Sequence, residues 1–469
     1  MDASSGAELR ERLIGALGDK NVRFAAEDLA AYAYDAYAES SVPFIVAAPS
    51  DARQVSAVVR IAAACGVPIV ARGAGTGLCG GSVPTSGGVV LSFSRMNRVL
   101  SLDAANRRAT VQPGLINFDL SRAAEPFGLF FGPDPSSQKI STIGGNTATN
   151  AGGPHALAYG SMSANVLGLE YVDSLGDITR ISVDDAGYDL VGALVGSEGT
   201  LGIVTAIELR LLRAPRAIRV GVAAFENVEA ASETVSAAIG AGIRATALEI
   251  MDSTIVQAVE AHYHAGFPLD AGAVLLVETA GEPDDVAASE RALATLAREH
   301  GALSWRSAGS ARERDALWAS RKGAAGALGR LAPNYYIQDA TVPRTRLPQA
   351  IAQVEAIARE HGLRVGNVFH AGDGNLHPLL LFDRRERREV EAVVHAGHDI
   401  LVCCIELGGT ISGEHGIGYE KRDALALVFN PNDLAAMLRL RDVFDPRRLF
   451  NPDKIFPSGA VCAEVLAAS

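Results

Sequence analysis

The residues of this chain best suited to chemistry are histidines that lie beside glycine-rich turns. His370 and His377 flank an Ala-Gly-Asp-Gly-Asn-Leu run, and a tight turn there would bring the two imidazoles together. A second polar stretch, Gly408–Gly418, adds Glu414 and His415. Two imidazoles and a carboxylate with open coordination positions suit a catalytic divalent metal, whereas ordinary turn residues are the plainer interpretation. We interpret the other seven histidines as surface or helix residues: His155, His262, His264, His300, His361, His395 and His398.

A glycine-rich loop, Arg72–Gly81, follows an expected strand. Gly75, Gly77 and Gly80 match the GxGxxG pattern of a Rossmann dinucleotide site. In that site the glycines open a helix, but here the chain continues with Ser82–Gly88, which is too rich in Gly, Pro and Ser to be helical. We therefore reject the Rossmann interpretation. Successive backbone N–H groups in such a loop suit a phosphate-binding nest, and a flexible surface linker is the alternative.

A second stretch, residues 130–155, consists almost wholly of small residues, turns and prolines, so we expect a long loop without secondary structure of its own. Loops of that length are usually functional. Small residues let a flat ring approach the backbone, and Asn and Thr supply hydrogen-bonding groups for a heteroaromatic edge. Two such loops in one domain indicate a large cofactor with both a pyrophosphate and a ring system.

A third element, Ala316–Lys322, is expected to be helical and ends in two cations. A guanidinium such as that of Arg321 can bind a carboxylate through two parallel hydrogen bonds. The stretch is therefore either an anion receptor or a solvated helix face.

The elements that must position these residues alternate along the chain. Residues 1 to about 40 are expected to be helical, and the character of the sequence changes near Ala214–Pro215. We expect strands at 44–50, 67–73, 89–93, 218–225, 273–279 and 363–369, and helices at 51–66, 284–301 and 346–362. The sequence thus predicts a first domain over 1–215, a second over 216–415 and a C-terminal segment over 416–469 that contains one helical stretch.

Composition restricts the function. The chain has 469 residues and a formal net charge of -12, which argues against nucleic-acid binding. We find no apolar run long enough to cross a membrane and no secretory leader, so we expect a cytoplasmic protein. The cysteines form no CxxC pair or ferredoxin-type run, so we expect no iron–sulfur cluster in this chain.

Taken together, the motifs resemble a known family. VARGAGTGLCGG, TIGGNTATNAGG and Gly196–Thr205 closely resemble the FAD-binding half of the vanillyl-alcohol oxidase type flavoproteins, over about 40–212 and again at Leu449–Pro452. NVFHAGDGNLHPLLLFD and GGTISGEHGIGYEKR resemble the family of the glycolate oxidase D subunit and the D-lactate and D-2-hydroxyglutarate dehydrogenases. The resemblance implies an α+β fold with a two-part FAD-binding domain, an α+β substrate (cap) domain and a helical C-terminal segment that returns to the FAD domain.

The resemblance also implies the cofactor site. Family members that attach FAD covalently use a histidine where this chain has Thr76, so we expect FAD to be held non-covalently. The implied FAD-binding residues are Arg72, Gly73, Ala74, Gly75, Thr76, Gly77, Pro133, Asp134, Ser137, Thr142, Gly144, Gly145, Asn146, Thr149, Glu198, Gly199, Ile203 and Asn451.

The resemblance assigns the remaining polar residues to catalysis. His370, His377 and Glu414 are the implied ligands of a divalent metal (Zn, Mn or Fe), His415 the active-site base and Arg321 the substrate-carboxylate receptor. Positions that bind the second carboxylate of hydroxyglutarate in its dehydrogenase fall here at Ala325, near Gln338 and at Leu379, and none of them carries a cation. This difference favours a short monocarboxylate.

The implied reaction is the oxidation of a short 2-hydroxy acid, glycolate to glyoxylate, with hydride transfer to FAD. D-lactate dehydrogenase is the alternative, and D-2-hydroxyglutarate dehydrogenase is a weaker one. A non-catalytic electron-transfer scaffold and a metal-dependent hydrolase are the alternatives from other functional classes. A scaffold subunit would be expected to lack the cluster of His370, His377, Glu414 and His415. A yellow purified protein would exclude the hydrolase. Since we expect no iron–sulfur cluster in this chain, electrons would pass to partner subunits (a second flavin-type subunit and an iron–sulfur subunit), to a quinone or to a soluble carrier. Through such partners the protein could attach peripherally to the inner membrane.

Overall fold

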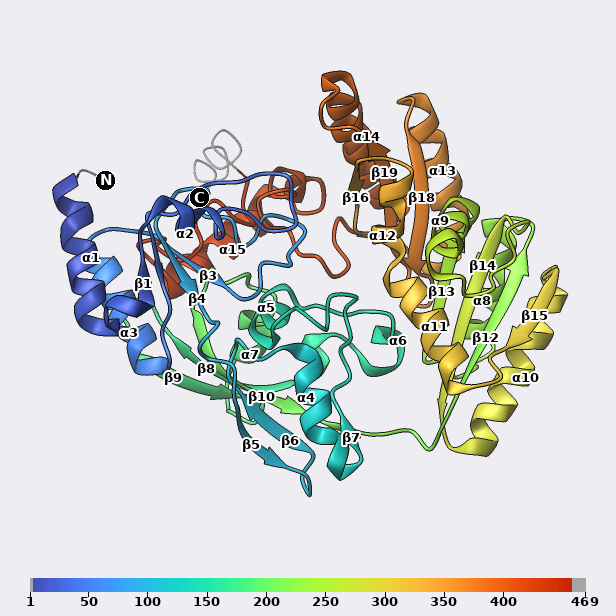
Figure 1. Ribbon diagram of the computed structural model, residues 1–469, viewed down its shortest axis with the longest axis horizontal. Coiled ribbons are helices and arrows are strands. Elements are labelled where there is room, and N and C mark those ends of the chain that lie inside the picture. Colours follow the sequence, from blue (N-terminus) through green and yellow to red (C-terminus); the bar gives the residue numbers. More distant parts are fainter. Residues whose placement is uncertain (1–2, 458–469) are drawn as a thin grey trace. The chain divides into compact units, whose positions relative to one another are not determined.

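The computed structural model describes residues 3–457 and contains both helices and sheets (Figure 1). The chain divides into two compact units. The first contains the chain up to Gly152, then Gly160–Ala214, and the chain from Glu414 onward. The second contains Gly153–Tyr159 and Pro215–Gly413. The short stretch Gly153–Tyr159 thus belongs to the second unit, although the sequence analysis assigns it to the first domain.

A small sheet with three parallel strands carries the first glycine-rich loop. It contains β1 (Val22–Arg23), β2 (Ile45–Ala47), β4 (Val89–Ser92) and β3 (Ile69–Arg72), in that order, and β1 is antiparallel to β2. Helix α3 (Ala52–Ala64) connects β2 to β3, begins at the N-cap Asp51, and packs against α1 (Ala3–Leu17). The predicted strands and the helix between them are confirmed.

The N-terminal region is less helical than expected. After α1 come a 3-10 turn at Asp19–Asn21, strand β1 and the short α2 (Ala26–Ala30). Residues 31–44 form turns, bends and isolated bridges. The Asp35 carboxylate there accepts the Tyr37 N–H at 2.9 Å and the Ser82 hydroxyl at 3.3 Å, and such side-chain hydrogen bonds compete with a helix.

A second sheet completes the first unit. Its antiparallel strands lie in the order β5 (Val99–Asp103), β6 (Arg108–Val111), β10 (Ile203–Arg210), β8 (Val166–Val172) and β9 (Ile178–Ser182). Shorter elements surround it: α4 (Asn117–Ala124), β7 (Leu129–Phe130), β11 (Leu212–Arg213) and α7 (Leu190–Leu194). The apolar core of this sheet includes Val111, Leu120, Ile143, Ile207 and Leu209, all fully buried.

The stretch 130–155 is not a structureless loop. It contains α5 (Ile143–Thr149), and α6 (Ala156–Tyr159) follows it. The Thr142 hydroxyl accepts a hydrogen bond from the Gly145 backbone N–H at 3.2 Å and begins α5, and Asn150 ends it in the left-handed conformation. Two good caps thus stabilise a short helix that its Gly and Thr content disfavours.

The chain after Glu414 packs within the first unit. It forms a 3-10 helix at Asp423–Leu427 and α15 (Pro431–Phe444), and then passes beside β3. There the Ile69 N–H donates to the Leu449 carbonyl at 2.8 Å, and the Asn451 N–H donates to the Ile69 carbonyl at 2.8 Å. The Phe450 side chain between them is fully buried in the core around α1 and α3.

The second unit is a large sheet with helices on both faces. Its strand order is β15 (Ser304–Ser307), β12 (Ala217–Phe225), β14 (Ala273–Gly281), β13 (Ala247–Asp252), β18 (Arg364–His370), β19 (Asn375–Phe382) and β16 (Asn334–Ile337), and β17 (Ala340–Thr341) pairs with β19. Helices α8 (Val228–Gly240), α10 (Pro283–Glu299), α13 (Leu347–Glu360) and α14 (Arg387–Glu406) contact one another in a layer. Helices α9 (Ser253–Tyr263), α11 (Ala311–Lys322) and α12 (Ala324–Ala327) form the other layer.

The helices of this fold do not include a membrane-spanning candidate within the described residues. Across residues 3–457, every helix is too short or too polar to traverse a bilayer.

We predict that Phe450→Ala destabilises the protein by about 3–5 kcal/mol, because it leaves a cavity in a closely packed core. Urea unfolding of the full-length chain measures the change. Phe127→Ala is the matched control, because the Phe127 side chain is 57% exposed, and its free energy of unfolding should change by less than about 0.5 kcal/mol. Equal effects of the two substitutions would contradict a structural role for the C-terminal segment.

Candidate functional site

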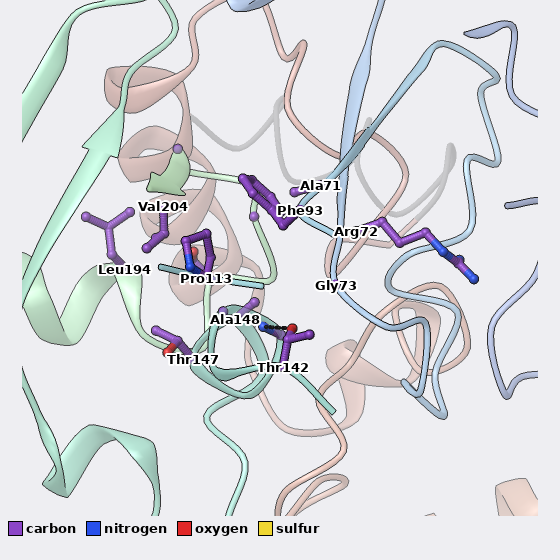
Figure 2. A pocket seen from close by; sticks show the side chains of 15 residues that line it. Ala71, Arg72, Gly73, Phe93, Pro113, Thr142, Thr147, Ala148, Leu194 and Val204 are labelled. Carbon is purple, nitrogen blue, oxygen red and sulfur yellow. Dashed lines mark hydrogen bonds between the residues drawn. The ribbon is translucent and has the colours of Figure 1, made fainter. Parts of the chain in front are cut away.

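A cavity in the first unit lies where the two glycine-rich stretches meet (Figure 2). Six of the predicted cofactor residues line it: Arg72, Gly73, Thr142, Gly144, Gly145 and Gly199. The side chains of Phe93, Pro113, Leu194 and Val204 supply an apolar wall on one side (Figure 2). The Gly144 and Gly145 N–H groups already donate to the Pro113 carbonyl and the Thr142 hydroxyl, so what the cavity offers is an apolar wall beside glycine backbone, which fits the flat ring of a large cofactor.

The glycines at this cavity are required by close packing. A Cβ on Gly73 would lie 2.2 Å from the Thr142 hydroxyl oxygen, and a Cβ on Gly144 would lie 2.5 Å from the Pro113 Cβ. The Asn146 Nδ2 atom is buried and has no hydrogen-bond partner among residues 3–457. A buried amide N–H₂ without a partner is costly, so it fits a polar edge of a bound ring.

The Arg72 side chain points away from this cavity (Figure 2). Its guanidinium donates to the Ser82 hydroxyl at 3.3 Å, and Asp35 accepts from the same hydroxyl. Burial lowers the pKa of Arg72, and burial likewise raises the pKa of Asp35. A Cβ on Gly75, which has a φ of +69°, would overlap the guanidinium, so the loop is folded around this side chain.

The other predicted cofactor residues lie outside the set that lines this cavity. Ala74 is exposed, and Gly75, Thr76, Gly77, Ser137 and Thr149 are half-buried, whereas Pro133, Asp134, Asn146, Glu198, Ile203 and Asn451 are buried. The Thr149 hydroxyl donates to the Gly145 carbonyl at 3.4 Å within α5. The Asn451 side-chain amide donates to the Gly81 carbonyl at 2.9 Å and to the Glu198 carbonyl at 2.7 Å, so it fixes two predicted loops to each other.

The Glu198 carboxylate connects the first unit internally. It accepts the Ile417 N–H at 2.7 Å and the Gly418 N–H at 2.8 Å, and its own N–H donates to the Ala148 carbonyl at 2.8 Å. Burial raises its pKa to about 7, against the opposing effect of the two backbone N–H groups and of Lys454 and Lys421. This carboxylate therefore holds the segment that directly follows Glu414 and His415.

In the second unit, polar side chains form a row on one face of the large sheet. Glu278 of β14, Glu249 of β13, His370 of β18 and His377 of β19 share this face, as the strand register shows. Two positions further along each strand, the same face carries apolar side chains that lie in the core beneath α9, α11 and α12: Met251, Leu276, Val368 and Leu379. We call these four polar side chains the polar row.

The tight turn after β18 brings its two histidines together. The ring centroids of His370 and His377 lie 5.1 Å apart in an edge-to-face arrangement. The turn itself, residues 371–374, needs glycine at Gly374, where φ is +81° and a Cβ would lie 2.3 Å from the Val342 carbonyl oxygen.

A buried carboxylate lies beside each ring, and the one beside His370 is within hydrogen-bond distance. Both Glu249 oxygens lie 2.9 Å from His370 Nδ1, and an Asp339 oxygen lies 3.9 Å from His377 Nδ1. A carboxylate at Nδ1 leaves Nε2 of His370 as the donor atom for a metal. Two such imidazoles fit Zn, Mn or Fe as part of a ligand set.

Arg321 lies in this network and not on a solvated helix face. Its Nη2 lies 2.5 Å from a Glu249 oxygen and 3.4 Å from His370 Nδ1, and its side chain is 4% exposed. Its Nε is buried and finds no hydrogen-bond partner within the described part of the chain. The guanidinium is therefore only partly satisfied by Glu249.

Glu414 and His415 are both half-buried and open the last segment of the first unit. The residue before them, Gly413, belongs to the second unit, where its N–H donates to Asp339 at 3.0 Å. The Ser412 hydroxyl donates to the same carboxylate oxygen at 2.8 Å. The carboxylate beside His377 thus holds the chain immediately before Glu414.

Sequence reasoning missed Glu249, Glu278 and Asp339. The first two stand in strands that otherwise read as continuous apolar runs, AL-E-IMD and AVLLV-E-TAG. A carboxylate in a buried strand is unusual enough to have been a signal. Of the three positions used to judge substrate length, Gln338 and Leu379 are buried and Ala325 is half-buried.

Two family models and several known proteins match this chain. Residues 43–182 match the FAD binding domain family, and residues 214–455 match the family of FAD linked oxidases, C-terminal domain. Two solved structures share the fold: 4-ethylphenol oxidase from Gulosibacter chungangensis, with a TM-score of 0.82 at 18% identity over 98% of each chain, and p-cresol methylhydroxylase, with a TM-score of 0.80 at 15% identity over 97% of each chain. The solved structures show the fold, which confirms the predicted α+β class, and the two family matches define the protein as an FAD-linked oxidase.

Curated relatives define the family more closely. Glycolate oxidase subunit GlcD of Bacillus subtilis is 41% identical over 97% of each chain, and that of Escherichia coli K12 is 41% identical over 90% of this chain and 85% of the relative. D-lactate dehydrogenase of Anaerostipes hadrus is 32% identical over 88% of this chain and 89% of the relative. The chain belongs to the family of FAD-linked oxidases that contains these proteins.

The buried Glu198 carboxylate predicts a pH dependence of stability. Because its pKa is about 7 in the folded protein and about 4.5 when exposed, the folded protein keeps a proton that the unfolded chain loses. The stability that the protonated Glu198 contributes is therefore fully present below about pH 4.5. It is lost as the pH rises to about 7, which lowers the free energy of unfolding by at most about 3 kcal/mol.

Glu198→Gln should flatten this dependence, although its stability at low pH falls because one backbone N–H loses its acceptor. Urea unfolding of the full chain between pH 4.5 and 7.5 measures the slope. Glu208→Gln, a substitution of a partly exposed carboxylate, should keep the slope of the parent protein. A parent-like slope in Glu198→Gln would show that another group titrates.

Proposed function

We propose that this protein oxidises a short 2-hydroxy acid, glycolate to glyoxylate, as the catalytic subunit of a glycolate oxidase. The observation that carries the proposal is the buried Arg321 guanidinium beside His370 on one sheet face. Such a site offers an anion receptor and two imidazoles within one compact network. The relatives named glycolate oxidase subunit GlcD, at 41% identity, support this substrate.

Arg321 is the residue that holds the substrate carboxylate in this proposal. Its Nε has no partner among the described residues, so a substrate oxygen would satisfy it. Glu249 keeps the guanidinium fixed, because the buried ion pair at 2.5 Å restricts its rotation. Removing Arg321 altogether would take away the cation beside the buried Glu249 and leave it with His370, so Arg321→Lys, which keeps a positive charge, is the more informative substitution.

We infer two cofactors. FAD binds non-covalently in the first unit, at the cavity that six of the eighteen residues implied by the family resemblance line. A divalent metal (Zn, Mn or Fe) is held by His370, His377 and Glu414. When bound, the metal polarises the substrate hydroxyl and FAD takes up the hydride from C2.

The protein's own residues supply the remaining steps. Arg321 binds and orients the carboxylate, and Glu249 keeps His370 in the tautomer that presents Nε2. His415 accepts the hydroxyl proton, a contribution of about 10²–10⁴-fold in rate for a general base. The apolar wall around Phe93 and Val204 excludes water from one side of the first-unit cavity.

Electrons must then leave the flavin. We propose transfer to a partner subunit, a second flavin-type subunit together with an iron–sulfur subunit, or to a quinone. A cytoplasmic location, with peripheral attachment to the inner membrane through these partners, follows from that proposal. The sequence motifs supply no iron–sulfur ligands in this chain, which is the support for an external acceptor.

D-lactate is the second candidate substrate. The relative named D-lactate dehydrogenase, at 32% identity over 89% of its length, favours it. D-lactate differs from glycolate by one methyl group on C2, so the same carboxylate receptor and imidazoles would serve both.

We predict that His370→Ala removes the metal but retains FAD, because the two predicted sites use different residues. Metal analysis should give less than about a tenth of the parent content, and acid precipitation should release one FAD per chain into the supernatant. Glu249→Gln should weaken metal binding by about 10–100-fold, the usual effect of removing a carboxylate that orients a ligating histidine.

His300→Ala is the control for these measurements, because His300 is partly exposed and lies 3.8 Å from Glu233 on another helix. An unchanged metal content in His370→Ala would remove His370 from the ligand set. Flavin retained in the acid pellet would contradict non-covalent binding.

We predict a kcat/KM for glycolate or D-lactate at least about 10²-fold above that for D-2-hydroxyglutarate, measured by dye reduction. The positions that the resemblance assigns to a second carboxylate, Ala325, near Gln338 and Leu379, carry no cation, and burying a second carboxylate without a partner is costly. Arg321→Lys should lower kcat/KM for all three substrates, since the ammonium loses the two-pronged contact. Equal turnover of D-2-hydroxyglutarate would refute the short-substrate assignment, and a higher kcat/KM for D-lactate than for glycolate would select the second candidate.

A further inference from the structure

One histidine that the sequence assigns to the surface lies inside the second unit. His155 has a side chain that is only 15% exposed, and it belongs to the stretch Gly153–Tyr159. This stretch follows directly after Asn150–Gly152 of the second glycine-rich loop. Leu157 in the same stretch approaches the histidine turn, because a Cβ on Gly372 would lie 2.6 Å from its Cδ2. Tertiary packing therefore moves His155 from the expected surface to the polar row.

The Glu278 carboxylate holds His155 in place. His155 Nε2 lies 3.0 Å from one Glu278 oxygen, and the Thr246 hydroxyl donates to the same oxygen at 3.1 Å. The Trp318 indole N–H donates to the other oxygen at 2.7 Å. A buried carboxylate with three donors is well satisfied, so it fixes both rings.

The two rings also contact each other. The His155 and Trp318 centroids lie 4.9 Å apart, and the Tyr159 ring stacks near His155 at 6.0 Å. Because each ring is bound to Glu278 as well, neither can rotate away without losing a hydrogen bond.

Trp318 places this ring pair beside the anion receptor. Trp318 and Arg321 are three residues apart on α11, so they lie on the same helix face about 5 Å apart along the axis. Both reach carboxylates of the polar row, Trp318 reaching Glu278 and Arg321 reaching Glu249. The ring pair therefore stands within about one helical turn of the guanidinium.

We propose that His155 and Trp318, fixed by Glu278, limit the length of the substituent on C2 of the 2-hydroxy acid. The inference rests on the proposed function, because it takes Arg321 as the carboxylate receptor. In this proposal a C2 hydrogen or methyl group is accommodated beside the ring pair, whereas an ethyl or propyl group meets it. The ring pair thus selects a short substrate in this proposal, in addition to the missing cations at Ala325, Gln338 and Leu379.

The expected effect follows from the cost of one methylene group. A pocket wall discriminates against an added methylene by about 10–200-fold in kcat/KM. We therefore expect kcat/KM of the parent enzyme to fall by at least about 10-fold from D-lactate to D-2-hydroxybutyrate. Removing the imidazole should reverse most of this loss.

The test compares His155→Ala with the parent enzyme on glycolate, D-lactate, D-2-hydroxybutyrate and D-2-hydroxyvalerate. The ratio of kcat/KM for D-2-hydroxybutyrate to that for glycolate should rise at least about 10-fold. Trp318→Leu, which opens the wall from the other ring, should raise the same ratio. His155→Gln, which keeps bulk and a donor for Glu278, should stay within about 3-fold of the parent ratio.

His300→Ala is the matched control, since it removes a histidine that faces a glutamate elsewhere in the second unit. Thermal unfolding and FAD content identify any variant that fails to fold. If one of His155→Ala and Trp318→Leu fails to fold, the other variant provides the test. If both His155→Ala and Trp318→Leu lower kcat/KM equally for all four substrates, so that the ratios are unchanged, the inference is wrong and the ring pair has a structural role alone. If the parent enzyme oxidises none of the four acids, the proposed function itself fails, which is a separate result.

Discussion

A carboxylate that is removed from water must find its donors inside the protein, and this requirement places the functional segments of both units. In the first unit Glu198 accepts two backbone N–H groups from the segment that follows His415. In the second, Glu249 lies against Arg321 and His370, and its side chain is 1% exposed. Arg321 and His370 are thus held by one buried anion.

This arrangement changes how Arg321 is understood. A substrate-binding arginine on a solvated helix face could be replaced with little effect on folding. Here the guanidinium also neutralises a buried carboxylate, which in turn orients His370. The anion receptor and the imidazole pair are therefore one network, and a substitution in either part affects both.

Sheet geometry explains why the network is compact. Side chains alternate between the two faces of a strand, so one register places Glu278, Glu249, His370 and His377 in a row across four neighbouring strands. The residues two positions further along each strand are apolar and anchor the sheet to α9 and α11. The polar row is the end of the same face that forms the core.

The amino-acid sequence by itself determined the local features. It indicated the βαβ arrangement around Arg72, the histidine turn, the family resemblance and the residues suited to FAD, because these depend on short-range spacing and on residue type. It misjudged the stretch 130–155, where the caps at Thr142 and Asn150 stabilise α5. Only the tertiary structure decided that Glu249 pairs with Arg321 and Glu278 with His155, residues 72 and 123 positions apart. Those pairs arise from strand register and helix packing, and a carboxylate buried among apolar neighbours does not reveal in the sequence which distant donor will satisfy it.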